Sequence, residues 1–150
     1  MKLAAALTER ADIQRRLEEL GSRLNNNAKV QDGERPAEDP AVLLGEMDTL
    51  LERLEELMVR INLTNSATVI SGQTVTAWIA KRDCLKKRLL LMRNFLDKAS
   101  QKIDRYSRTE ILIRSTVDVA DLQKQLDAVS KELREVDEKI QEANWTTELK

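Results

Sequence analysis

Four long stretches of this chain carry apolar residues that alternate three and four positions apart, and this spacing limits the fold more than any other feature. The alternation places one apolar stripe along one side of an α-helix, as in helices that pack lengthwise against each other. We therefore predict an all-α fold of four long antiparallel, coiled-coil-like helices over residues of about 2–25, 40–64, 75–106 and 118–144. The only polar residues among the stripe positions are Arg10 and Arg82.

The segments between the stripes contain helix-start and turn signals. Asp39 and Asp118 precede the second and fourth stripes and are expected to cap those helices, with Pro40 at the first helical position. The dipeptide Ser71-Gly72 favours a tight turn between two very short strands. We also predict that residues 28–31 pair with the β-prone residues 111–114 as a two-stranded cap.

Composition restricts the class of protein. A chain of 150 residues is within the usual size of one domain, so we expect a single helical-bundle domain over 1–150. Lys plus Arg number 25 and Asp plus Glu number 26, a balance that gives no attraction to nucleic acid. No apolar run reaches the roughly 20 residues that a membrane span requires.

The expected compartment is the cytoplasm. The apolar run at the N-terminus is interrupted by Glu9, Arg10 and Asp12 before it reaches the length of a signal peptide. The lone cysteine, Cys84, cannot form an internal disulfide, and this fits a reducing environment.

Additional apolar residues widen the stripes of the second and third predicted helices. Leu44, Leu51 and Met58 form a second stripe at seven-residue intervals, and residues 89–92 are all apolar. A helix that is apolar over most of its circumference must be buried on several sides. We therefore expect the third helix to be central, or the protein to form homo-oligomers through the third helix.

A set of segments that together span nearly the whole chain carries a family resemblance: 27–31, 38–40, 61–68, 82–83, 105–108 and 140–145. On these segments the chain resembles the septicolysin-like family of small bacterial proteins, which have no established biochemical role. The family name implies a pore-forming cytolysin, and so a membrane-active toxin. The residues themselves argue against that activity, because they contain neither an expected secretion signal nor a membrane-length apolar segment.

Most residue types used in catalysis are missing or isolated. The chain has no histidine, so the Ser-His and Cys-His nucleophile pairs and the usual base near neutral pH are excluded. One cysteine cannot form a structural zinc site, and the four glycines are too scattered for a phosphate-binding loop. We predict no catalytic residues, no metal and no cofactor, and we expect the protein not to be an enzyme.

The two stripe arginines are the sharpest candidate site. Each follows the first residue of its stripe by seven positions, so in an up-down-up-down bundle both would lie in one layer near the chain termini. Two cations in a dry layer require compensating charge. One interpretation is a salt-bridge layer that fixes helix register, with Asp137 or with Glu55 and Glu56. The other is a site for a small anionic metabolite, with nearby amide donors from Asn62, Asn65 and Asn144.

These features favour a self-associating structural or interaction protein that acts through protein contacts. The alternative is an enzyme or binding module that holds a small carboxylate or phosphate between Arg10 and Arg82. The membrane-active toxin implied by the resemblance is the third interpretation.

Overall fold

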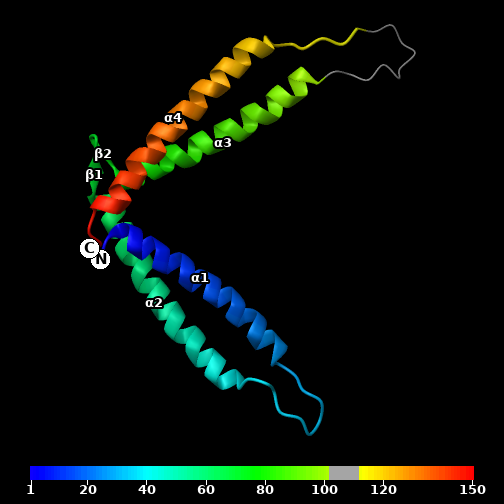
Figure 1. The fold of residues 1–150 in the computed structure, drawn as a ribbon, viewed down its shortest axis with the longest axis vertical. Coiled ribbons are helices and arrows are strands. Elements are labelled where there is room, and N and C mark those ends of the chain that lie inside the picture. The colour runs from blue at the N-terminus through cyan, green and yellow to red at the C-terminus, as the bar shows by residue number, and fades with distance from the viewer. Residues whose placement is uncertain (102–111) are drawn as a thin grey trace. The chain divides into compact units, whose positions relative to one another are not determined.

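The computed structural model describes residues 1–101 and 112–150 and contains four long helices (Figure 1). Their bounds are α1 Leu3–Asn26, α2 Pro40–Ala67, α3 Val75–Ser100 and α4 Val119–Thr146. The predicted all-α fold of four long helices is therefore confirmed. The predicted continuation of the third helix to residue 106 is not present at Gln101, and 102–106 lie outside the described residues.

The expected capping residues begin α2 and α4. Asp39 accepts a hydrogen bond from the Ala41 backbone N–H at 2.9 Å through its Oδ1, and Pro40 is the first residue of α2. In α4, the Asp118 carboxylate accepts one from the Asp121 backbone N–H at 3.1 Å. A side-chain oxygen at this position satisfies a backbone donor that has no partner within the helix.

A two-residue hairpin joins α2 to α3, as predicted. The strands are β1 (Val69–Ile70) and β2 (Gln73–Thr74), which pair antiparallel. Ser71 and Gly72 at the turn have φ angles of 49° and 80°. A two-residue turn with both φ angles positive matches the twist of the strands, and glycine adopts this conformation at little cost.

The predicted cap between residues 28–31 and 111–114 is wrong over its described part. Residues 28–31 and 112–114 form no strand, and Ile111 lies outside the described residues. The connection after α1 turns instead, with the Glu34 N–H donating to the Gln31 carbonyl at 2.9 Å and Gly33 at a φ of 86°. The turn engages the Gln31 carbonyl, which is then not available for pairing with a neighbouring strand.

The described helices pack as two compact units. Unit 1 contains Met1–Val75 and Glu142–Lys150, and unit 2 contains Thr76–Gln141. Each unit is built on one antiparallel pair of helices. That both units belong to a single cooperative domain over 1–150 remains a prediction.

Unit 1 is a hairpin of α1 and α2 whose core is the first two predicted stripes (Figure 1). Buried and partly buried apolar residues together follow the three-and-four alternation on both helices, with Arg10 at one position of the α1 stripe, so each helix turns one stripe toward the other. Leu149, close to the C-terminus, also belongs to this core. The buried set is Leu3, Ala6, Ile13, Leu20, Leu43, Leu50, Leu57, Ile61 and Leu149.

Unit 2 has its own core between α3 and α4. It consists of Trp78, Leu85, Leu89, Leu126, Val129, Val136 and Ile140. In the apolar run at 89–92, Leu89 is buried and Met92 packs against the core, while Leu90 and Leu91 are 60% and 70% exposed. Within this unit, α3 is therefore not surrounded on all sides, and the other predicted possibility, oligomerisation through this helix, remains a prediction.

No helix within residues 1–101 and 112–150 combines the length and the apolar content that crossing a bilayer requires.

Candidate functional site

One flank of the α1–α2 hairpin is closed by ion pairs that recur every seven residues. Glu9 pairs with Arg53 at 2.7 Å, and Arg16 pairs with Glu46 at 3.5 Å. Two stripes packed face to face leave a narrow border on each side, where charged side chains of the two helices can meet. We call this border the charged flank. The pairs also fix the antiparallel register, because seven residues forward on α1 correspond to seven residues back on α2.

The far end of the charged flank joins the end of α1 to the start of α2. Arg23 binds Glu38 with two nitrogens, Nε at 3.0 Å and Nη2 at 2.5 Å. Asn27, buried at the last turn, donates to the Arg23 carbonyl at 2.8 Å and accepts from the Glu38 N–H at 2.9 Å. These contacts hold the ends of the two helices together where their connecting loop begins.

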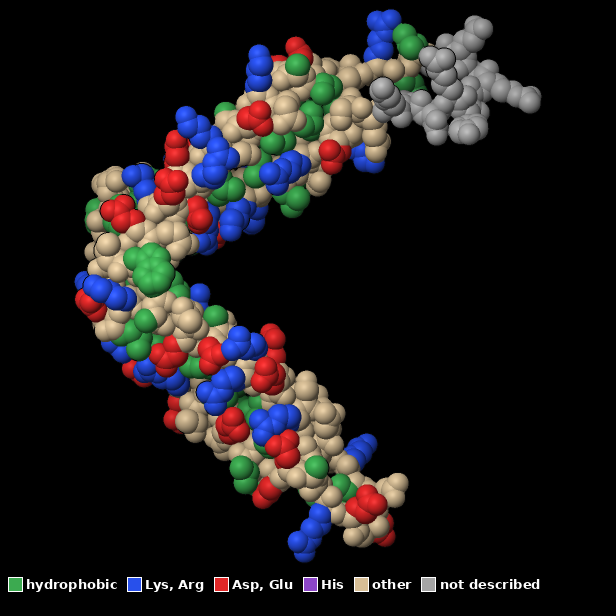
Figure 2. Space-filling model, viewed as in Figure 1, with side chains coloured by type: hydrophobic (Ala, Val, Ile, Leu, Met, Phe, Trp, Pro, Cys, Tyr) green, Lys and Arg blue, Asp and Glu red, His purple; other side chains and the backbone are tan. Residues whose placement is uncertain are grey.

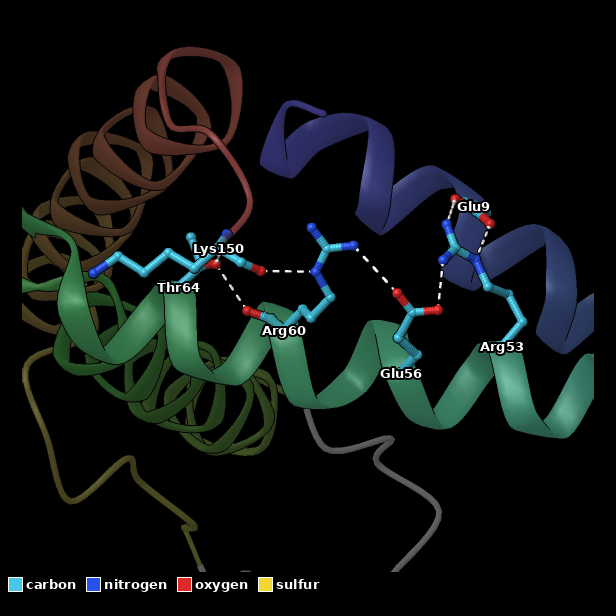
Figure 3. A network of polar contacts seen from close by, with 6 residues as sticks. All are labelled: Glu9, Arg53, Glu56, Arg60, Thr64 and Lys150. Atoms are coloured by element: carbon cyan, nitrogen blue, oxygen red, sulfur yellow. Dashed lines mark hydrogen bonds and ion pairs between the residues drawn. The ribbon is translucent and has the colours of Figure 1, made fainter.

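Toward the other end, a polar network continues along α2 to the C-terminus (Figure 3). Arg53 binds both Glu9 and Glu56, and Glu56 also accepts a hydrogen bond from Arg60 at 3.3 Å. Arg60 in turn donates from Nε to the Lys150 carbonyl at 2.7 Å. Charged and backbone groups from α1, α2 and the C-terminal segment therefore form one connected network.

The carboxylates in this network titrate abnormally because arginines hold their ionised forms. Hydrogen bonds from Arg53 lower the pKa of Glu9 and the pKa of Glu56 below the ordinary value of 4.5. The same two partners raise the pKa of Arg53, with Glu9 contributing most. These shifts arise from structural pairing and need no catalytic role, although perturbed groups are often functional.

The last residues of the chain pack on unit 1. Leu149 is 8% exposed in the core, and its N–H donates to the Met1 carbonyl at 2.8 Å. Beside it, Lys2 pairs with Glu148 at 2.6 Å. Thr64 of α2 is fully buried and accepts the Lys150 N–H at 3.0 Å through its hydroxyl oxygen. The C-terminal segment is thus held by burial, backbone hydrogen bonds and an ion pair.

The opposite flank of the hairpin is apolar and open. Leu44, Leu51 and Met58 follow one another at seven-residue intervals on α2, and are 46%, 44% and 46% exposed. Leu7 of α1 is partly buried and packs against the edge of the core. We call this border, formed by Leu7, Leu44, Leu51 and Met58, the apolar flank.

The surface drawn in Figure 2 is mostly charged and polar, unlike the apolar flank. Figure 2 shows basic and acidic side chains interspersed along both helical pairs. A surface with mixed charges favours solubility over association. Val42, Val59 and Leu63 of α2 are also exposed, but unlike the residues of the apolar flank they do not recur at seven-residue intervals. The apolar flank is therefore the candidate surface of unit 1 for binding another helix.

The predicted arginine layer is divided between the two units. Arg10 is half-buried on α1 in unit 1, whereas Arg82 and Asp137 are half-buried on α3 and α4 in unit 2. Arg82 pairs with its neighbour Asp83 at 3.1 Å. Among the described residues Arg10 takes part in no salt bridge. One shared layer for the two arginines remains a prediction.

The three predicted amide donors all belong to unit 1. Asn62 is exposed and Asn144 is half-buried, while Asn65 is 9% exposed and its Oδ1 has no hydrogen-bond partner among the described residues. Asn65 and Asn144 both lie inside their helices, because α2 continues to Ala67 and α4 to Thr146.

Sequence reasoning missed the charged flank, although a signal for it was present. Glu9, Arg16 and Arg23 are spaced seven apart on α1, as are Glu46 and Arg53 on α2. Charges at such intervals beside an apolar stripe indicate pairing across helices. No group of His, Cys, Asp and Glu suited to hold a metal ion occurs within the described ranges 1–101 and 112–150.

Two comparisons relate the chain to known proteins. The model of a family of unknown function, DUF6847, matches residues 10–149. The chain is also similar to a functionally unknown conserved protein from Corynebacterium diphtheriae, known from a crystal structure. The identity is 42%, the match covers 100% of this chain and 99% of that one, and the TM-score is 0.94. No curated protein matches the chain.

Proposed function

We propose that this chain, which belongs to the family of unknown function DUF6847, is a self-associating helical protein that acts through protein contacts. The observation that carries the proposal is the apolar flank, where Leu44, Leu51 and Met58 are each nearly half exposed at seven-residue intervals. Isolated exposed apolar residues are common on protein surfaces, but a continuous stripe is a typical association surface.

Association is expected to be favourable because α1, the neighbour of α2 in the hairpin, leaves part of the apolar surface of α2 open. Burying apolar surface contributes roughly 25 cal/mol per Å², and α1 covers only the central stripe of α2. A further helix laid on the apolar flank would bury the side chains that remain open. Ion pairs occupy the charged flank, so association there would have to displace them.

The molar mass in solution tests this proposal. Light scattering on a dilution series of the whole protein should give a mass above that of one chain, falling toward 17.1 kDa on dilution. A mass of one chain at every concentration up to the solubility limit would refute self-association.

A second candidate function is binding of a small anion at the stripe arginines. It is supported by the half-buried Arg10, which has no salt-bridge partner among the described residues. Arg82 supports it less, because Asp83 already neutralises its charge. Inorganic phosphate and succinate should then raise the melting temperature of the protein, and less so after Arg10→Gln. No stabilisation by either anion would exclude this candidate.

The resemblance to septicolysin-like proteins adds membrane activity as a third candidate. That activity would release dye from liposomes at micromolar protein. Intact liposomes under those conditions would remove it.

A further inference from the structure

The apolar residues of α2 occupy three of the seven helical positions. The buried stripe includes Leu43, Leu50 and Leu57, and each residue of the apolar flank directly follows one of these. Successive residues are about 100° apart around an α-helix. The apolar face of α2 is thus wide enough for two neighbouring helices, the pattern of a helix in a bundle rather than in a hairpin.

On α1, two of the three positions level with the apolar flank carry small side chains. The register given by Glu9–Arg53 and Arg16–Glu46 places Ala11 level with Leu51 and Ala4 level with Met58. Leu44 is level with Glu18, and Gly21 lies within one helical turn of that level. A Cβ added at Gly21 would meet no atom within 4 Å. The α1 side of the flank therefore has room for large side chains from outside.

We propose that the occupant of the apolar flank is a second copy of this chain, with α2 of each copy packed on α1 of the other. This inference rests on the proposed function and names the partner and its orientation. A two-fold axis parallel to the helices leaves residue levels unchanged. Leu51 and Met58 of the second copy are then level with Ala11 and Ala4, and Leu44 lies within one helical turn of the space beside Gly21. The same axis repeats this contact on the other side, and the four helices form a bundle with antiparallel neighbours.

The charges that come to lie opposite each other favour this α1–α2 pairing over a pairing of α2 with α2. An antiparallel α2–α2 pairing centred on Leu51 would place Asp48 of each copy one residue from the level of Glu55 of the other, about 1.5 Å along the helix axis. Like charges at that distance are unfavourable and would occur twice. In the α1–α2 pairing, Asp48 is level with Gln14 of the other copy, one residue from Arg15. Glu18 follows Arg15 by three residues, so α1 presents one charge of each sign there.

Disulfide trapping between copies tests the orientation. In a Cys84→Ser background, since Cys84 is an exposed free thiol, one chain carries Glu18→Cys, which is level with Leu44, and a second, tagged chain carries Leu44→Cys. Mixing and oxidising them should join the two different chains, because disulfides require Cα atoms roughly 4.4–6.8 Å apart. Chains that carry Leu51→Cys alone should join to each other only at background level. Efficient joining through Leu51→Cys, or no joining of the mixed pair by an otherwise associating protein, would overturn the proposal.

A bulky residue provides a second, independent readout. Gly21→Phe should weaken association about tenfold or more by filling the space for Leu44. The matched variant Gly45→Phe, also a helical glycine with open space around it, lies outside the flank and should leave association unchanged. Equal effects of the two variants would overturn the proposed orientation. If the wild-type chain is a monomer in light scattering, the proposed function itself fails, and the two failures are thereby distinguished.

Discussion

Replacing Thr64 by valine should destabilise the protein by releasing the C-terminal segment. The Thr64 side chain is fully buried, and its hydroxyl donates to the Arg60 carbonyl at 2.8 Å while accepting the Lys150 N–H at 3.0 Å. Valine preserves the shape and removes both hydrogen bonds. The Arg60 carbonyl keeps its place in the helix, so most of the loss comes from Lys150. A net hydrogen bond is worth about 0.5–1.5 kcal/mol, and we expect the free energy of unfolding to fall by about 1 kcal/mol.

Thr49→Val is the matched control for this change. Thr49 is also on α2 and donates to a carbonyl four residues earlier, that of Gly45, at 3.1 Å, but it is exposed. Urea unfolding of both variants should show a clear loss for Thr64→Val only. Amide hydrogen exchange of Leu149 should accelerate in that variant alone, because its N–H is bonded to the Met1 carbonyl. Equal stabilities and equal exchange rates for the two variants would refute this account of the C-terminal segment.

Three other changes test the hairpin of unit 1. Leu57→Ala removes a fully buried side chain from the core and should lower the free energy of unfolding by about 2–5 kcal/mol in chemical denaturation. Gly45→Ala, in open space within α2, should raise it by about 0.5–1 kcal/mol through helix propensity, and no gain would contradict that reading. Arg53 lowers the carboxyl pKa values of Glu9 and Glu56. The ion pairs of these carboxylates therefore stabilise the folded protein fully above the ordinary pKa of 4.5, and this contribution is lost as the pH falls through the lowered pKa of the folded state. NMR titration of Arg53→Gln should return both carboxyl pKa values toward 4.5, and unchanged values would show that Arg53 does not cause the shifts.

The helices were predictable because their signals are local. The three-and-four alternation is a property of each helix alone, and Asp39 and Asp118 cap the helices that their positions indicated. The prediction that Leu44, Leu51 and Met58 form a second stripe rests on the same periodicity, and their exposure leaves that stripe open. The periodicity therefore indicated the helices and this second stripe, whereas association was expected through the third helix.

The pairing of helices could not be read from the stripes, because every stripe is apolar and compatible with every other. Arg10 and Arg82 were assigned to one layer on the assumption of a single bundle, and the structure assigns them to different units. The C-terminal segment was also missed. Leu149 enters the core of unit 1 outside any helical periodicity, and such a contact depends on chain geometry that spacing does not encode.

Sedimentation equilibrium on three proteins tests the central claim most directly. The apolar flank predicts that Leu51→Glu shifts the protein to the mass of one chain at concentrations where the wild type is associated. Val42→Glu is the matched control, since Val42 lies on the same helix, is 66% exposed and is not part of the flank. It should keep the mass of the wild type. If Leu51→Glu associates as strongly as the wild type, or if Val42→Glu dissociates the protein equally, the apolar flank is not the association surface.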